Sequence, residues 1–128
     1  MPVRANSSSP APLTTLEPAL YFVSAPIGSA RDITLRALDI LLCADVIAAE
    51  DTHTARKLME IHGVAVGDRQ LIAYHDHNGA AQRPRILRHL AEGRSVAYVS
   101  EAGTPLVADP GFQLGVSVLE AGLLVLSA

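Results

Sequence analysis

The stretch LYFVSAPIGSARDITLRAL, residues 20–38, decides the fold class of this chain. It opens with an apolar run at 20–24 and passes through a turn that contains proline and glycine. Ser29 stands where a helix N-cap belongs, and Asp32 follows three residues later in an imperfect capping box. Apolar residues at helical spacing come next. The stretch therefore predicts a buried strand, a tight turn and a helix, which form the first half of a β–α–β unit.

The alternation of short apolar runs and helical spacing continues along the rest of the chain. Four further strands are expected, at residues 46–49, 71–74, 95–99 and 123–126. The helices between them are bounded by capping and stop residues, namely Asp51 or Thr52, Gly63, Gly93, Asp109 with Pro110, and Gly122. The pattern predicts an α/β fold in which a mostly parallel five-stranded sheet is flanked by helices.

Length and composition limit the class of protein. The chain has 128 residues, 49% of them hydrophobic and 18% charged, which is enough for one domain with a buried core. Its net charge of -3 provides no overall basic field, so any contact with nucleic acid must be local or come from another chain or domain. The single cysteine, Cys43, is expected to be a small buried hydrophobe.

Targeting and membrane signals are absent from the sequence pattern. No apolar run approaches the roughly 18–20 residues that span a bilayer, and the first residues lack the apolar stretch of a signal peptide. A single cysteine gives no internal disulfide. We therefore expect a cytoplasmic protein without membrane contact.

The two ends of the chain differ in composition. Residues 1–18 are rich in serine, proline and alanine without apolar periodicity, so we expect a disordered leader there and a folded domain at 19–128. The last expected strand is apolar and has no covering element after it. For this reason we expect the chain to be a fragment of a longer protein, with part of the function outside it.

Three strand-to-helix loops are expected to carry the chemistry, because ligands of open parallel sheets bind beyond the carboxyl ends of the strands. These loops are residues 25–29, 50–53 and 100–111. In the third, Gly103 lets the backbone approach a ligand closely while prolines stiffen the path. The chain has neither a GxGxxG motif nor a phosphate-binding P-loop motif, so the usual dinucleotide and triphosphate sites are not predicted.

The second loop contains the adjacent carboxylates Glu50 and Asp51 at the end of a strand. Such groups can act as a base, orient a hydroxyl or balance a cationic ligand. Asp51 has a structural alternative, because an aspartate in this place can cap the following helix. Both roles stay open on sequence grounds.

The segment YHDHN, residues 74–78, is the next polar cluster. His75 and His77 share one side of an extended segment, but no third ligand stands at a fitting distance in sequence, so a metal site is not predicted. A polar loop that bonds locally or touches substrate is expected instead. Basic residues after it, Arg83, Arg85 and Arg88, form either a stripe that faces phosphate or a solvated helix face.

Taken in order, the segments LYFVSAPIGSARDITLRAL, IAAEDTH, YHDHN and VSEAGTPLVADPG resemble the tetrapyrrole methylase superfamily. The resemblance covers residues 20–126 and is greatest to the branch that methylates small-subunit ribosomal RNA. It implies the N-terminal domain of a two-domain enzyme that uses S-adenosylmethionine to methylate the ribose 2′-hydroxyl of a cytidine in 16S rRNA of the 30S subunit. It also implies a homodimer, with the cofactor between the domains, and a fragment that is inactive alone.

The resemblance assigns roles to matching positions. Cofactor contacts are implied at Pro26, Gly28, Ser100, Glu101, Ala102, Gly103 and Thr104. Catalytic candidates are Glu50 and Asp51, candidates for contact with RNA are His53, Arg56, His75 and Asn78, and no metal is implied. The chain departs from the family pattern at Ala25 for threonine, Ser29 for asparagine, His53 for arginine and Glu101 for aspartate. The last departure moves a carboxylate outward by one methylene, which bears most on cofactor contacts.

Two other functions are alternatives to rRNA methylation. A tetrapyrrole C-methyltransferase of the same superfamily is disfavoured, because such relatives carry a GDP-like loop where this chain has EAGTP, residues 101–105. The other alternative is a domain without catalytic activity that binds a nucleotide-like ligand or serves in assembly.

Overall fold

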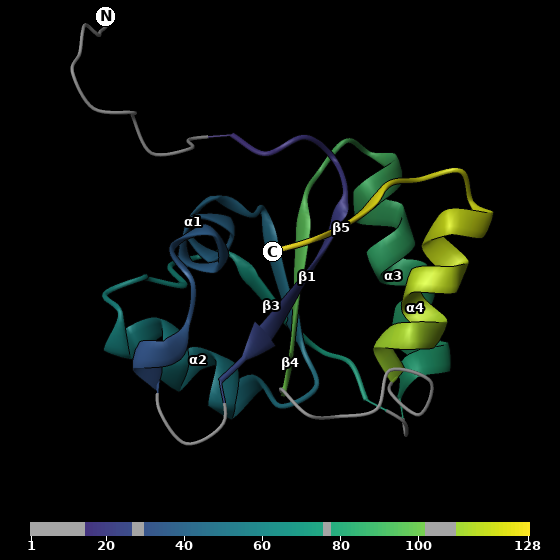
Figure 1. The fold of residues 1–128 in the computed structure, drawn as a ribbon. Coiled ribbons are helices and arrows are strands. Elements are labelled where there is room, and N and C mark those ends of the chain that lie inside the picture. The colour runs from purple at the N-terminus through teal and green to yellow at the C-terminus, as the bar shows by residue number, and fades with distance from the viewer. Residues whose placement is uncertain (1–14, 27–29, 76–77, 102–109) are drawn as a thin grey trace, which may run out of the picture.

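The computed structural model describes residues 15–26, 30–75, 78–101 and 110–128, and it confirms the predicted α/β fold (Figure 1). In chain order the elements are β1 (Leu20–Ala25), the 3₁₀ turn η1 (Ala30–Asp32), α1 (Leu35–Cys43), β2 (Val46–Ala49), α2 (Thr52–Ile61), β3 (Gln70–Ala73), α3 (Gly79–Ala91), β4 (Val96–Glu101), α4 (Pro110–Glu120) and β5 (Val125–Ser127). The strands form one sheet in the order β3-β2-β4-β1-β5, and every pair is parallel.

The sheet separates two apolar cores, because its side chains alternate between the faces. Helices α1 and α2 cover one face, and α3 and α4 cover the other (Figure 1). The first core gathers buried residues such as Tyr21, Val23, Ile40, Leu41, Ile47, Met59 and Val99. The second gathers Leu20, Ile72, Tyr74, Ile86, Tyr98, Leu114 and Val118. β4 is buried from Val96 to Val99 because it lies at the centre of the sheet with both faces covered.

The first helix begins later than the sequence predicts. Its N-cap is Thr34, whose extended backbone (φ -77, ψ 156) presents Oγ1 to the backbone N–H of Ala37 at 3.0 Å. The expectation of an N-cap at Ser29 is therefore wrong for α1, and Asp32 belongs to the separate turn η1. Thr34, a second hydroxyl residue before the apolar helical face, thus takes the capping position of α1.

Several strand boundaries also differ from the prediction. β4 runs to Glu101 instead of residue 99, because Ser100 and Glu101 pair with the last two residues of β1. β3 begins at Gln70, one residue earlier than expected. The last strand is the short edge strand β5, and it is half-exposed where a buried strand was expected. Cys43 is half-buried and not a fully buried hydrophobe, and this burial raises the pKa of its thiol.

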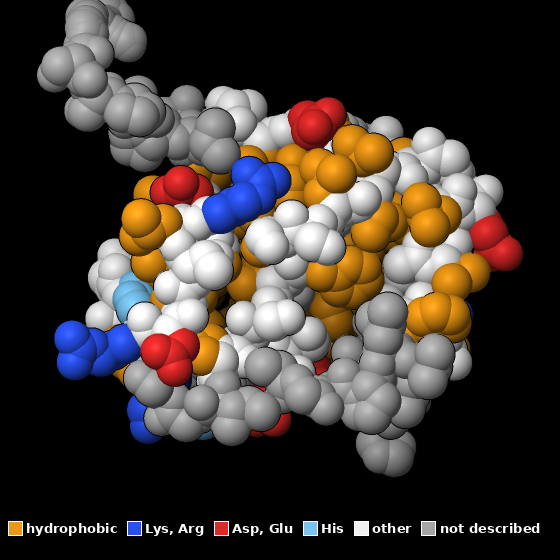
Figure 2. Space-filling view, viewed as in Figure 1, with side chains coloured by type: hydrophobic (Ala, Val, Ile, Leu, Met, Phe, Trp, Pro, Cys, Tyr) orange, Lys and Arg blue, Asp and Glu red, His pale blue; other side chains and the backbone are white. Residues whose placement is uncertain are grey.

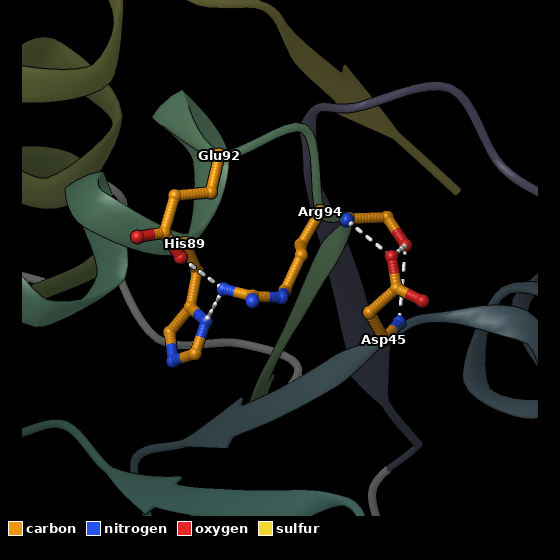
Figure 3. Close-up of polar contacts among 5 residues, drawn as sticks. Asp45, His89, Glu92 and Arg94 are labelled. Carbon is orange, nitrogen blue, oxygen red and sulfur yellow. Dashed lines mark hydrogen bonds and ion pairs between the residues drawn. The ribbon is translucent and has the colours of Figure 1, made fainter.

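The amino ends of β2 and β4 are fastened to each other by a reciprocal pair of hydrogen bonds (Figure 3). The N–H of Asp45 donates to Ser95 Oγ at 3.0 Å, and the N–H of Ser95 donates to Asp45 Oδ2 at 2.9 Å. Nearby, Arg94 contacts His89 and pairs with Glu92. Burial, together with the charge of Arg94, lowers the pKa of His89. These contacts join the strands at this edge, and a cavity of about 440 Å³ opens beside them, lined by Asp45, Val46, Asp68, Arg69, Gln70, His89 and Arg94.

Arg69 ties the segment before β3 to the end of α1. Its Nη1 donates to the carbonyl oxygens of Leu41 and Ala44 at 2.7 and 2.9 Å, and its Nη2 donates to the carbonyl of Ala65 at 2.6 Å. A cation at the C-terminus of a helix satisfies carbonyls that have no helical partner and complements the helix dipole.

Among the described residues, none of the helices has the length and apolarity to cross a membrane.

Candidate functional site

The carboxyl ends of the strands lie along one edge of the sheet, since all pairs are parallel. The three central strands there are β2, β4 and β1, and Glu50, Glu101 and Pro26 respectively stand at or just after their ends. β1 leads to α1 on one face, whereas β4 leads to α4 on the other. The connections that follow these two neighbouring strands therefore run to opposite faces of the sheet, and open α/β sheets bind ligands at such a point.

The strand register sets the shape of this edge. Ala25 of β1 is level with Glu101 of β4, while β2 ends with Ala49 opposite Val99. β4 therefore extends two residues beyond β2, which is about 7 Å at about 3.3 Å per residue. Ser100 is half-buried and Glu101 is exposed. The other expected cofactor residues, Gly28, Ala102, Gly103 and Thr104, lie outside the described residues.

A cavity of about 340 Å³ opens beside the end of β1. It lies between β1, β5 and the segment that leads into α1, and it is lined by Phe22, Ser24, Pro26, Asp32, Ile33, Thr34, Ala37, Ser127 and Ala128. Of these, the sequence assigned only Pro26 to a site. Ser24 gave a signal, because it is a polar residue near the end of an otherwise apolar strand.

Asp51 is the N-cap of α2. Its Oδ1 accepts from the backbone N–H groups of His53 and Thr54 at 3.0 and 3.3 Å, and its Oδ2 accepts from the Thr54 hydroxyl at 3.0 Å. The bonds from Thr54, first that of its backbone N–H, hold the pKa of Asp51 below its ordinary range. The structural alternative for Asp51 is thus confirmed, and both of its oxygens are engaged in it.

Glu50 lies one residue earlier, at the very end of β2. Its side chain is half-buried, and its backbone N–H donates to the carbonyl of Val99 at 3.2 Å. This bond fixes the Glu50 backbone against the central strand β4. The neighbouring cationic candidates, His53 and Arg56, are exposed on the first turns of α2. A carboxylate on a fixed backbone, with exposed polar side chains beside it, suits a polar substrate.

The loop after β3 is built by Asn78. Its Oδ1 accepts from the N–H of His75 at 2.8 Å, and its Nδ2 donates to the carbonyl of Ala73 at 2.9 Å. The N–H of Tyr74 donates to the carbonyl of Ala49 at 2.8 Å, which sets this loop beside Glu50. The structure thus brings His75 and Asn78 to the same edge as Glu50, with the Asn78 amide used inside the loop.

Two further sequence questions bear on this edge. His77 lies outside the described residues, and within the part of the chain that is described no three potential metal ligands converge. The basic residues of α3 do not share one direction, because Arg83 bonds Tyr74 and Gln113 whereas Arg85 bonds Gln70 and Gln82. These two arginines therefore do not form a continuous stripe that faces phosphate.

Comparison with known proteins decides the family. A family model described as Tetrapyrrole (Corrin/Porphyrin) Methylases matches residues 19–124. The chain belongs to the tetrapyrrole methylase family. Among its relatives in this family is Ribosomal RNA small subunit methyltransferase I of Mesorhizobium japonicum, which is 46% identical over 114 residues, or 89% of this chain and 38% of the relative. The protein of the same name from Escherichia coli O157:H7 is 45% identical over 83% of this chain and 36% of the relative.

Solved structures of this family share the fold. A cobalt precorrin-4 methyltransferase of cobalamin biosynthesis superimposes with a TM-score of 0.70 at 18% identity, over 86% of this chain and 44% of that protein. Uroporphyrin-III-C-methyltransferase from Thermus thermophilus gives a TM-score of 0.62 at 23% identity, over 86% of this chain and 46% of that protein. These similarities establish the fold alone. The chain spans less than two fifths of the length of the curated methyltransferases named above.

Proposed function

We propose that this chain is the N-terminal domain of an S-adenosylmethionine-dependent methyltransferase that modifies small-subunit ribosomal RNA. One observation carries the proposal: 46% identity, over 89% of the chain, to a protein named Ribosomal RNA small subunit methyltransferase I. The geometry supports it, because the matching segments that follow β1, β2 and β3 meet at one edge of the sheet. An rRNA substrate would place the work in the cytoplasm.

The described residues at this edge fit a cationic methyl donor. Carboxylates stand at Glu50, Asp51 and Glu101, and Asp32 lines the cavity beside β1. Negative groups around a sulfonium favour binding by simple electrostatic attraction. When bound, S-adenosylmethionine supplies an activated methyl group. We propose that Pro26, Ser100 and Glu101 help to hold it, together with Gly28, Ala102, Gly103 and Thr104, which the structure does not describe.

The residues of this chain would then align the acceptor. Methyl transfer is an in-line displacement, so most of the rate enhancement comes from holding the two reactants in the right geometry. Of the two candidate bases, we favour Glu50, because both oxygens of Asp51 serve the helix cap and its lowered pKa makes it a weaker base. Glu50 would accept the proton of a ribose 2′-hydroxyl or orient it, with His53, Arg56, His75 and Asn78 on the RNA side.

Pairing of two copies is the remaining part of the proposal. Figure 2 shows hydrophobic side chains at the surface over α4. Phe112, Val116 and Leu119 are exposed at helical spacing along this helix, and Leu124 is exposed just beyond it. Exposed apolar stripes of this kind often mark protein interfaces, which supports a homodimer. The cytidine and its 2′-oxygen as the methylated atom are inferred from the resemblance to the rRNA methylase branch.

The test is a methyl-transfer assay with the full-length polypeptide. We would incubate it with radiolabelled S-adenosylmethionine and 30S subunits purified from a strain that lacks the gene. Label in 16S rRNA, traced by nuclease digestion to a 2′-O-methylcytidine, is expected. Subunits from the parent strain are the matched control and should take up little label, because their site is already modified. No incorporation into either preparation would contradict the proposal.

A further inference from the structure

Arg83 connects three elements on the sheet face covered by α3 and α4. From α3, its Nε donates to the hydroxyl oxygen of Tyr74 at 3.1 Å, and its Nη2 donates to Gln113 Oε1 at 3.1 Å. Tyr74 directly follows β3, and Gln113 lies in the first turn of α4. One guanidinium therefore bridges the loop after β3 and the start of α4.

Tyr74 is the fixed end of this bridge. Its side chain is fully buried, and its ring meets that of Tyr98 edge to face at 5.7 Å between centroids. Its backbone N–H donates to Ala49, and its carbonyl accepts from the Tyr98 hydroxyl at 3.4 Å. Tyr74 directly follows β3 and is bonded to β2 and β4, so the arginine contacts a group anchored to the sheet.

The other end of the bridge is the start of α4. The expected cofactor residues after Glu101 lie in the segment that joins β4 to Pro110, the first residue of α4. The pairing of Glu101 with Ala25 fixes where this segment begins. The bond from Arg83 to Gln113 fixes the turn at which it ends. At the Tyr74 end of the bridge, the backbone N–H donates to the carbonyl of Ala49, the residue directly before Glu50.

We propose that Arg83 is a positioning residue for methyl transfer, which sets the distance between the acceptor side of this edge, at residues 50–53, 74, 75 and 78, and the start of α4 at residues 110–113. This inference rests on the proposed function. Catalysis by alignment is sensitive to small displacements, because a misplacement of about 1 Å can cost about 100-fold in rate. Loss of the bridge should therefore affect turnover much more than folding.

A bridge needs both of its arms, and this gives a specific test in the full-length polypeptide. Tyr74→Phe removes one arm, Gln113→Leu removes the other, and Arg83→Met removes both. We expect each variant, and the Tyr74→Phe/Gln113→Leu double variant, to lose about 10-fold in kcat for methyl transfer to 30S subunits, within the range that misalignment explains. KM for the subunits and Kd for S-adenosylmethionine should stay within about twofold, because no ligand contact is removed.

Two controls separate positioning from general stability. Arg85→Met removes a neighbouring guanidinium of α3 that bonds only the surface glutamines Gln70 and Gln82 among the described contacts, and it should leave kcat unchanged. Gln113→Glu keeps an acceptor for Arg83 and should restore near wild-type kcat. All assays are run at a temperature where circular dichroism shows every variant fully folded.

The outcomes are distinguishable. If the losses from Tyr74→Phe and Gln113→Leu multiply in the double variant, the two bonds act independently and the bridge is refuted. Unchanged kcat with a lowered Tm would assign Arg83 to stability alone and also refute it. An inactive wild-type polypeptide would instead refute the proposed function itself, and this inference with it.

Discussion

Replacing Asn78 with alanine tests whether this amide builds the loop after β3 or serves only to contact substrate. The change removes the bond from the His75 N–H at 2.8 Å and the bond to the Ala73 carbonyl at 2.9 Å. It leaves the bond from the Asn78 N–H to the His75 carbonyl in place. Each lost side-chain bond contributes about 0.5–1.5 kcal/mol. We therefore expect a loss of about 2 kcal/mol in the free energy of unfolding.

Thermal unfolding followed by circular dichroism measures this loss. For a domain of this size, about 2 kcal/mol corresponds to a decrease in Tm of about 6–10 °C. Gln82→Ala is the matched control, because this amide on α3 only accepts a long 3.4 Å bond from Arg85 among the described contacts. It should change the free energy of unfolding by less than about 0.5 kcal/mol.

Asn78→Asp sharpens the test through its pH dependence. The new carboxylate keeps an acceptor for the His75 N–H, but it places an oxygen against the Ala73 carbonyl where Nδ2 now donates. This repulsion raises the pKa of the introduced carboxyl in the folded state, so protonation restores the donor. The deficit relative to wild type should be smallest in acid and grow as pH rises through that raised pKa. Unchanged Tm in Asn78→Ala, with weakened RNA binding, would refute a structural role.

Three further predictions concern groups away from this loop. Asp51→Ala should lower the free energy of unfolding by about 1 kcal/mol at neutral pH, because the α2 cap is lost. Because the pKa of Asp51 is lowered in the folded state, urea denaturation should show this difference above about pH 4 and lose it as pH falls through the lowered pKa. Wild type should lose stability as pH falls below about 6.5, since the lowered pKa of His89 disfavours protonation in the folded state, and His89→Gln should remove this loss. Equal slopes of unfolding free energy against pH in the two proteins would contradict this. Arg69→Met should lower the free energy of unfolding by about 2–3 kcal/mol and speed hydrogen exchange in the last turn of α1, because the bonds to the carbonyls are lost. Arg69→Lys should recover part of this loss. An unchanged denaturation midpoint in Arg69→Met would show that the carbonyl contacts contribute nothing.

The strands and their order along the chain were predictable, because short apolar runs such as 46–49 and 96–99 that alternate with helical spacing are typical of a buried parallel sheet. Their ends were less so. β4 extends to Glu101 because β1 offers hydrogen-bond partners there, and no local property of Ser100 or Glu101 reveals that. The start of α1 at Leu35 was not predicted either, because two hydroxyl residues, Ser29 and Thr34, precede the apolar helical face and either could serve as a cap.

The edge of the sheet where these loops meet could be predicted from sequence, but the contacts made there could not. Strand-to-helix loops of a parallel sheet must share one edge, so Glu50, His75 and Pro26 were placed correctly as neighbours of that edge. The contacts from Arg69 to Ala44 and from Arg83 to Gln113 join residues 25 and 30 positions apart, and nothing in the local pattern indicates them. The role of Asn78 was also hidden, because an amide that closes a loop looks the same in sequence as one that faces substrate.

Hydrogen exchange of the full-length polypeptide, with and without S-adenosylmethionine, tests most directly whether the carboxyl edge of the sheet holds the methyl donor. Peptides covering residues 24–26 and 100–101 are predicted to gain protection when the donor is added. Peptides covering residues 45–46 and 94–95, at the amino edge where Asp45 and Ser95 bond each other, should not change. Protection at the amino edge, with none at the carboxyl edge, would contradict the account.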